Sequence, residues 1–214
     1  MGTAERRQRE KDWRRNEIVL AAEKIFFAKG FENTTIEDIA SVAELSKGTI
    51  YLYFDSKEQL HGAVVMRGVA ILSGMFHEAF EGADTGLEKT KAIGAAYMRF
   101  FREQEDYFDA LLRYEFHEVE KIGKHDPMLI LIDALKIGIE DGSVRQDIDP
   151  VKMAILLWGQ TTGVVQNNHR KCKAITDAFD IDCDEIIEYY MEQVKRMLAA
   201  DVPSGGGGAG SEDV

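Results

Sequence analysis

The chain has 214 residues, of which 45% are hydrophobic and three are proline, so it is long enough to bury a core in one large domain or two unequal ones. Its formal net charge of -12 argues against unspecific binding of nucleic acid, because polyanions attract proteins mainly through positive charge. No apolar run reaches the roughly 18 residues needed to span a bilayer, and the charged N-terminus lacks the apolar stretch of a signal peptide. We therefore expect a soluble cytoplasmic protein without a membrane partner.

The charge is unevenly distributed along the chain. Residues 1–30 contain eight basic and five acidic side chains, whereas residues 31–60 contain two basic and six acidic ones. The first 60 residues therefore have a net charge of -1, and the remainder of the chain has -11. Any contact with a polyanion is expected in the N-terminal part.

The first helix is expected at residues 12–29. Ile18, Ala22 and Phe26 fall on one helical face, and Lys29 followed by Gly30 is typical of a helix end. Residues 1–11 are then expected to form a flexible arm. Whether this basic arm touches DNA stays open.

Two short helices are expected next. The motif TTIE at residues 34–37 matches a capping box, with Thr34 as the N-cap and Glu37 bonding back to it, and the helix should end near Ala43. Ser46 can cap a third helix that ends near Leu52.

Further helix starts follow the same rules. Residues 56–59, SKEQ, form another capping box before a long apolar helix that reaches about Phe80. Later starts are expected at Thr85, Asp126, Asp149, and Asp182 or Asp184. About nine helices result, and because no segment alternates with period two, we predict an all-α fold. Residues 1–56 should form an N-terminal three-helix domain, residues 57–200 a larger helical domain, and residues 201–214 a flexible tail.

The two short helices predict a helix-turn-helix, which places its second helix in the major groove of DNA. Only Glu44 and Leu45 join them, and Ile50 should point inward with Leu45 and Phe54. The opposite side of the second helix carries side chains that suit an anionic duplex: Lys47, Gly48, Thr49, Tyr51 and Tyr53.

The segment TTIEDIASVAELSKGTIYLYFDSKEQL resembles the DNA-binding segment of the TetR family of transcriptional regulators, over about residues 14–65. The resemblance implies a ligand-responsive repressor, whose larger domain binds an inducer and dimerises. With Ser46, which starts the same helix, the residues expected at DNA are Thr35, Ser46, Lys47, Gly48, Thr49, Tyr51, Tyr53 and Lys57. One departure is Glu44, where many relatives have glycine. A left-handed backbone at this position would cost about 1 kcal/mol relative to glycine, and the carboxylate would oppose DNA.

Two amphipathic stretches predict a homodimer built as a four-helix interface, an arrangement that the resemblance also implies. They are VKMAILLWGQTTGVVQ and DEIIEYYMEQVKRML, and Gly159 and Gly163 in the first would let another helix approach closely. The residues expected at this interface are Val151, Ile155, Trp158, Thr162, Val165, Ile186, Ile187, Tyr190, Val194 and Met197.

An effector pocket is predicted from composition. Aromatic rings mixed with polar groups in residues 93–117 and near Trp158 are typical of pockets for amphipathic or aromatic molecules, although aromatic residues at helical spacing more often form a plain core. The expected lining residues are Tyr97, Phe101, Phe108, Tyr114, His117, Trp158 and Gln160.

Other classes of function find little support. His169, Cys172, Cys183 and a neighbouring aspartate offer metal ligands, but their spacing matches no compact zinc site. Two cysteines are too few for a disulfide framework and fit a reducing compartment. No phosphate loop or nucleophile motif occurs, so we expect no metal, no cofactor and no enzymatic activity. Two alternatives remain open: an activator or global regulator with the same helix-turn-helix, and a ligand-binding dimer whose DNA binding has decayed.

Overall fold

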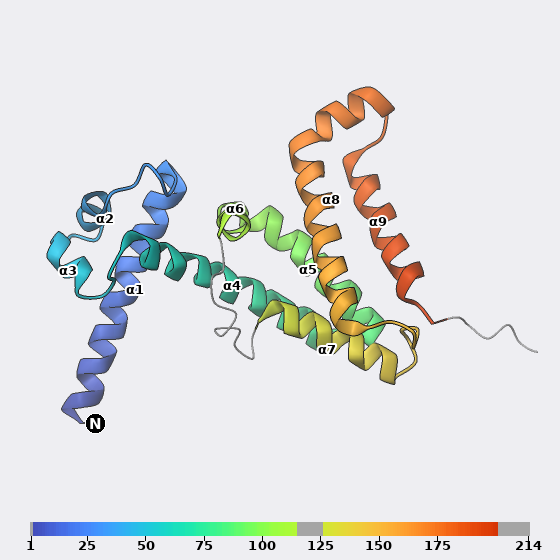
Figure 1. Cartoon of the computed structure of the whole chain (residues 1–214), viewed down its shortest axis with the longest axis horizontal. Coiled ribbons are helices and arrows are strands. Elements are labelled where there is room, and N and C mark those ends of the chain that lie inside the picture. Colours follow the sequence, from blue (N-terminus) through green and yellow to red (C-terminus); the bar gives the residue numbers. More distant parts are fainter. Residues whose placement is uncertain (1, 115–125, 201–214) are drawn as a thin grey trace, which may run out of the picture. The chain divides into compact units, whose positions relative to one another are not determined.

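The computed structural model describes residues 2–114 and 126–200, and the expectation for the 201–214 tail and for His117 lies outside them. These residues form nine α-helices, which confirms the all-α prediction (Figure 1). The helices are α1 (Thr3–Lys29), α2 (Ile36–Val42), α3 (Lys47–Tyr51), α4 (Lys57–Glu81), α5 (Gly86–Glu103), α6 (Glu105–Arg113), α7 (Pro127–Glu140), α8 (Pro150–Phe179) and α9 (Cys183–Leu198).

The chain folds into two compact units. The first consists of residues 1–73 and 100–123, and the second of residues 74–99 and 124–214. Both α4 and α5 are shared between the units, so compactness alone does not define a boundary at residue 56. A DNA-binding domain that ends there stays a prediction.

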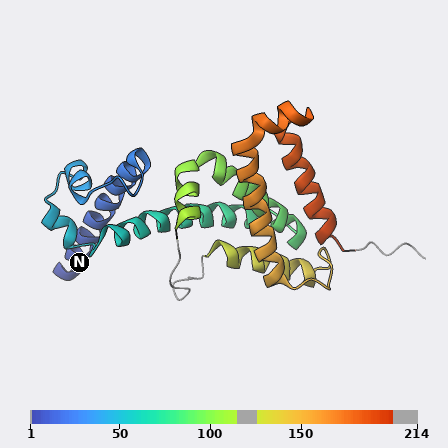
Figure 2. The ribbon, with the colours of Figure 1, turned by 45° about the horizontal axis from the view of Figure 1, so that its top comes forward.

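The core of the first unit lies where α2 and α3 pack beside α1 (Figures 1 and 2). Ile18 and Ala22 of α1 are fully buried, as are Ile39 of α2 and Ile50 of α3. This packing holds two helices of only seven and five residues, which would not be stable alone.

A polar network joins three helices of the same unit. The Arg67 guanidinium of α4 donates to the Glu23 carboxylate of α1 at 3.0 Å and to the Tyr107 hydroxyl of α6 at 3.2 Å. Tyr107 donates to the same carboxylate. Burial and the Glu23 carboxylate raise the pKa of Tyr107, so its hydroxyl stays neutral.

Helix α1 begins at Thr3, so the expectation of a flexible arm at residues 1–11 was wrong. Arg6 pairs with Glu10 at 2.9 Å, and Gln8 donates to Asp12 at 2.8 Å. These side-chain pairs, four residues apart, stabilise an exposed helix without any apolar face. Apolar periodicity does not detect such a segment.

Most other helix starts were predicted correctly. Thr85 and Glu88 form the expected capping box at α5, and Asp126 and Asp149 cap α7 and α8, each before a proline. Of the two aspartates proposed for the last helix, Asp182 is the cap of α9. Local capping chemistry therefore marks these boundaries well.

The second unit contains a close approach between α5 and α7. A methyl group added at Gly86 would lie 1.9 Å from the backbone nitrogen of Gly138, so neither helix tolerates a side chain there. In the same unit α8 and α9 run side by side (Figure 2).

Cys172 and Cys183 form a disulfide bond that joins α8 to the first residue of α9. The sequence analysis, which found two cysteines too few for a disulfide framework, did not predict this bond. Eleven residues separate them in the sequence, and only the reversal of the chain between the two helices brings them together.

Helix α4 is long and apolar enough, by length and composition alone, to cross a membrane, so the expectation that no segment reaches this length was wrong. One such helix is weak support for a membrane segment, because the core helix of a soluble protein passes the same test. Leu60, Val64 and Leu72 of α4 are buried inside the protein.

Candidate nucleic-acid interface

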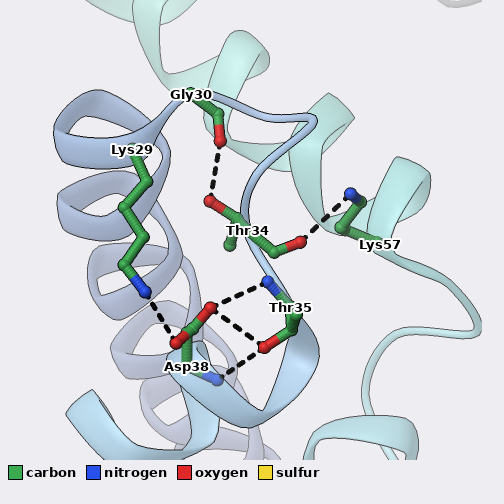
Figure 3. A network of polar contacts seen from close by, with 6 residues as sticks. All are labelled: Lys29, Gly30, Thr34, Thr35, Asp38 and Lys57. Atoms are coloured by element: carbon green, nitrogen blue, oxygen red, sulfur yellow. Dashed lines mark hydrogen bonds and ion pairs between the residues drawn. The ribbon is translucent and has the colours of Figure 1, made fainter.

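The start of α2 is fixed by a reciprocal capping box (Figure 3). The Asp38 backbone N–H donates to the Thr35 hydroxyl oxygen at 3.2 Å, while the Asp38 carboxylate accepts from the backbone N–H and the hydroxyl of Thr35. The expected box of Thr34 and Glu37 was therefore wrong by one residue. Thr34 is buried, and its hydroxyl donates to the Gly30 carbonyl oxygen at 2.8 Å.

Charge strengthens this cap. The Lys29 ammonium lies 2.7 Å from the Asp38 carboxylate and, with the Thr35 hydrogen bonds, lowers the pKa of Asp38 to about 2. The carboxylate is therefore ionised at any neutral pH. The Thr35 hydroxyl already donates to the Asp38 carboxylate. A contact of this hydroxyl with DNA therefore stays a prediction, and it requires Thr35 to break this hydrogen bond or to share it with the DNA.

The turn between α2 and α3 contains a left-handed residue. Glu44 has φ of 54°, and the Leu45 N–H donates to the Ala40 carbonyl oxygen at 2.9 Å, which closes the turn. Glu44 therefore has the left-handed backbone conformation that the sequence analysis considered for it. A non-glycine residue in this conformation costs roughly 1–2 kcal/mol, because its Cβ approaches the following carbonyl oxygen.

Helix α3 is oriented by its cap and by one buried side chain. The Ser46 hydroxyl accepts from the Thr49 backbone N–H at 3.1 Å and shares a hydrogen bond with the Thr49 hydroxyl at 2.8 Å. Ile50 is fully buried, and Phe54 beyond the helix is 1% exposed, as predicted. With Ile50 turned inward, the opposite side of α3 faces solvent.

The exposed side of α3 carries most of the residues expected at DNA. Lys47 and Gly48 are exposed, and Tyr51 is 45% exposed. Leu52, which the sequence analysis treated only as the helix end, is 78% exposed and offers an apolar contact for a thymine methyl group. Leu52 follows the buried residue Ile50 by two positions, and this spacing could have predicted that its side chain is exposed.

Gly48 is not required by the packing of the free protein. A methyl group added there would meet only the Ser46 hydroxyl oxygen, at 3.7 Å, which is an ordinary contact. Glycine also lowers the stability of a helix by roughly 0.5–1 kcal/mol relative to alanine. A glycine that the fold does not need, on the exposed side of α3, fits close approach of a partner.

Lys47 is paired with Glu37 of α2 in the free protein. Their hydrogen bond lowers the pKa of Glu37 and raises the pKa of Lys47, so both remain charged. Both side chains are exposed, and such pairs contribute little to stability. The carboxylate does, however, compete with a DNA phosphate for the Lys47 ammonium.

Lys57 has a structural role that the sequence did not reveal. Its ammonium donates to the Thr34 carbonyl oxygen at 3.1 Å (Figure 3). It also donates to the Phe31 carbonyl oxygen at 2.9 Å and lies 4.3 Å from the centre of the Phe31 ring. These bonds tie the start of α4 to the loop before α2. An ammonium has three N–H groups, so one remains for the expected contact with a phosphate.

Comparisons with known proteins agree with this geometry. Residues 18–64 match the family described as bacterial regulatory proteins, tetR family. The chain is 26% identical over 201 residues to the HTH-type transcriptional repressor KstR2 of Rhodococcus jostii, covering 89% of this chain and 93% of that protein. It is 25% identical over 175 residues to the probable acrEF/envCD operon repressor of Escherichia coli K12, covering 72% and 74%. The solved structure of the fatty acid degradation regulator FadR from Bacillus halodurans has the same fold, with a TM-score of 0.64 and 20% identity, covering 88% of this chain and 96% of that one.

The helix-turn-helix segment of the chain belongs to the tetR family. The chain is therefore a DNA-binding transcriptional regulator and not an enzyme, as this segment predicted. In this tetR-family protein the described residues contain no group of three metal-binding side chains placed to hold an ion.

The second unit of the tetR-family protein encloses a small cavity of about 30 Å³. Three aromatic rings of its wall, Phe76, Tyr97 and Trp158, pack with centroids 5.0 to 6.3 Å apart. The Tyr97 hydroxyl and the Thr162 hydroxyl share a hydrogen bond of 2.8 Å, and burial raises the pKa of Tyr97 to about 12. The wall is thus largely apolar, with neutral hydroxyl groups and one charged residue, Lys91, among its lining residues.

Only two of the expected effector residues, Tyr97 and Trp158, line this cavity. Phe101 and Phe108 pack against each other in the first unit, with ring centroids 4.9 Å apart. Two others also lie elsewhere: Tyr114 contacts His61 in the first unit, and Gln160 lines an open groove between α8 and α9. Wall residues that the sequence analysis missed are Phe76, Thr90, Lys91, Ile93, Gly94, Leu131, Leu157, Thr161, Met191 and, from the expected dimer set, Tyr190 and Val194. The helical spacing of Thr90, Ile93, Gly94 and Tyr97 was the available signal.

The residues expected at the dimer interface fall into two groups, one buried within the protomer and one exposed or partly exposed. Val165 and Val194 are buried within the protomer, so these two were wrongly assigned to an exposed face. Trp158, expected at both the pocket and the interface, lines the cavity. Hydrogen bonds between hydroxyl groups within the unit join Thr162 to Tyr97 and Tyr190 to Thr161. The expected members that are exposed or partly exposed are Val151, Ile155, Trp158, Thr162, Ile186, Ile187, Tyr190 and Met197. Leu156, which was not predicted, is 55% exposed.

We expect Glu44→Gly to raise the free energy of unfolding by about 1 kcal/mol, because glycine adopts φ of 54° without strain. In a protein of this size the midpoint of thermal unfolding should rise by about 2–4 °C. Glu44→Ala serves as the control, since it removes the charge and keeps the strain. Equal stabilisation by both variants would show that charge, not backbone conformation, limits stability here.

We expect Glu37→Gln to strengthen DNA binding by about two- to fivefold at moderate salt, because it frees the Lys47 ammonium and removes a negative charge beside it. Fluorescence anisotropy with a labelled duplex measures the affinity. Glu32→Gln makes the same charge change in the loop before α2. If both variants strengthened binding equally, the effect would be one of net charge and not of the ion pair.

Proposed function

We propose that the protein is a homodimeric repressor that binds a two-fold-symmetric operator and releases it when a small molecule enters the cavity of the second unit. The observation that carries the DNA-binding half of the proposal is the orientation of α3. Burial of Ile50 directs Lys47, Gly48 and Tyr51 to solvent. Lys47 offers an ammonium, Gly48 lets the DNA approach the backbone closely, and Tyr51 offers a phenolic donor.

A dimer is favoured by the length of α3. Five residues contact too few base pairs for a specific site, whereas two copies held one helical turn of DNA apart read two half-sites. The relatives named KstR2 and acrEF/envCD operon repressor support repression as the direction of control. These names support the proposal by similarity only.

The surface that fits a second copy is the exposed side of α8 with part of α9. Gly159 and Gly163 line a groove of about 470 Å³ between these helices, and a methyl group at either glycine would meet nothing within 4 Å. The exposed side chains of Ile155 and Leu156 lie on the same helix. Small residues that leave open space within the protomer fit close packing against a helix from another copy.

The cavity supports an effector that is largely apolar and carries a hydrogen-bonding group. Tyr97, Thr161 and Tyr190 offer hydroxyl groups, while Phe76 and Trp158 offer ring surface. At about 30 Å³ the cavity is far smaller than the 300–1,000 Å³ typical of ligand sites. Entry of an effector therefore requires α5, α8 and α9 to separate, so the effector selects a conformation that differs from this one.

The DNA-binding half is tested by selection from a random duplex library at moderate salt, with the double variant Lys47→Ala/Tyr51→Ala beside the wild type. We expect a two-fold-symmetric motif, and a loss of at least about tenfold in specific affinity in the variant, since each such contact contributes about 1–3 kcal/mol. Lys24→Ala, which removes a charge from α1, is the control.

Each alternative gives a different result in this experiment. Unchanged specific affinity in the double variant would exclude α3 as the reading helix, and a wild type that retains no motif would point to decayed DNA binding. Transcription in vitro from a promoter that carries the selected motif separates repression from activation.

The effector half is tested through Trp158, one of two tryptophans in the chain, in a Trp13→Phe background. Titration with a long-chain fatty acid should change the Trp158 fluorescence to saturation and weaken operator binding by about 5- to 150-fold, the usual range of coupling between two sites. Gly94→Leu should fill the cavity beside Met191 and remove both effects while leaving operator binding intact. A fluorescence change that persists in Gly94→Leu would place the ligand elsewhere.

A further inference from the structure

The two cysteines lie where the chain reverses between α8 and α9. Their Cα atoms are 5.7 Å apart, within the range of disulfide bonds. Cys172 is partly exposed, Cys183 is buried, and the turn between the helices contains the left-handed residue Asp180. A protein that binds chromosomal DNA works in a compartment that keeps thiols reduced, where a disulfide is usually transient, catalytic or redox-sensing.

The charged residues next to the two cysteines in the sequence have opposite signs. Cys172 is flanked on α8 by three exposed cations, Arg170, Lys171 and Lys173. Positive charge stabilises a thiolate, which is the reactive form of cysteine. The acidic residues Asp177 and Asp180 come later in the sequence than these cations, at the C-terminal end of α8.

Cys183 has the opposite surroundings, since the carboxylates of Asp182, Asp184 and Glu185 flank it. Its position at the N-terminus of α9 would favour a thiolate, but the Asp182 side chain already accepts the Asp184 N–H at 2.7 Å. Cys183 is also buried, so the partly exposed Cys172 is the sulfur better placed to meet an oxidant from solvent. Opposite charge on the two segments also favours their approach.

We propose that Cys172 and Cys183 are an oxidant-responsive thiol–disulfide pair whose substrate class is hydroperoxides. The Cys172 thiolate attacks the terminal oxygen of the hydroperoxide, an S–O bond forms, the O–O bond breaks, and the leaving alkoxide or hydroxide takes a proton from solvent. The Cys183 sulfur then attacks the resulting sulfenic acid, the S–S bond forms, and water leaves with the Cys183 proton. The hydroperoxide is reduced by two electrons, one from each sulfur. A small-molecule thiol returns the pair to the reduced state by exchange.

Closure of the bond restrains the tip of α8 and α9. The Asn168 side chain donates to the Cys183 carbonyl oxygen at 2.7 Å, and the Thr176 hydroxyl donates to the Ile181 carbonyl oxygen at 3.0 Å. These hydrogen bonds remain after reduction, but the covalent link is lost. The reduced protein should therefore exchange the backbone amides of residues 176–186 faster than the oxidised protein.

The test starts with the full chain, reduced and freed of reductant, and adds one equivalent of hydrogen peroxide. We expect two free thiols per chain before oxidation and none after it, with a peptide map that joins Cys172 to Cys183 within one chain. Amide exchange at residues 176–186 should slow on oxidation. A disulfide between chains, or thiols that survive, would overturn the proposal.

Variants test the separate roles of the two cysteines. Cys183→Ser should trap a sulfenic acid on Cys172 that dimedone labels, whereas Cys172→Ser should leave Cys183 as a thiol. Lys171→Gln/Lys173→Gln should slow oxidation severalfold, and Lys136→Gln/Lys152→Gln, with the same charge change on α7 and the start of α8, should not. Preferential sulfenic acid on Cys183, or equal rates in the two lysine variants, would contradict the assigned roles. All readouts are independent of DNA, so failure here is distinct from failure of the proposed repressor function.

Discussion

The burial of Ile50 is the contact on which the DNA-binding surface depends. A helix of five residues is far below the length at which an isolated helix is stable in water, so α3 exists only because it packs against α1 and α2. Ile50 is fully buried, and the side chains on the other face are directed outward as a consequence. The Ser46 cap and the left-handed turn at Glu44 then fix where the helix begins.

The same surface carries charges that oppose its task. Glu37 holds the Lys47 ammonium, and the Glu44 carboxylate lies in the turn directly before α3. The N-terminal 60 residues have a net charge of -1, so unspecific attraction to DNA is weak. A regulator with these charges must gain its affinity from fitted contacts with the DNA, which favours specific sites over unspecific DNA.

How far the sequence predicted the structure depended on whether a signal was local. Helix caps at Ser46, Asp126 and Asp149 were predicted correctly, because a capping side chain bonds to backbone within three residues. Where two threonines stand together, the choice between Thr34 and Thr35 depended on burial of Thr34 against the Gly30 carbonyl, which the motif does not contain.

Non-local features could not be predicted in this way. Helix α8 is apolar on two sides. One side is packed inside the protomer at Ala154, Leu157 and Val165, and the other is exposed at Ile155 and Leu156. Apolar periodicity alone therefore assigned residues from both sides to one predicted dimer interface. The disulfide required two helices to bring residues 172 and 183 together.

The network of Glu23, Arg67 and Tyr107 shows how α6 is coupled to α1 and α4 within the first unit. Tyr107 also packs against Gly68 of α4, where an added methyl group would lie 2.9 Å from the ring. A shift of α6 therefore cannot leave α1 and α4 unchanged. It must either move Arg67 and Glu23 as well or break their partly buried hydrogen bonds with Tyr107. Breaking these bonds is costly, because the Glu23 carboxylate would lose a hydrogen-bond partner. Motion of α6 is therefore coupled to α1 and to the helices packed on it, because the three side chains of the network join helices of one unit.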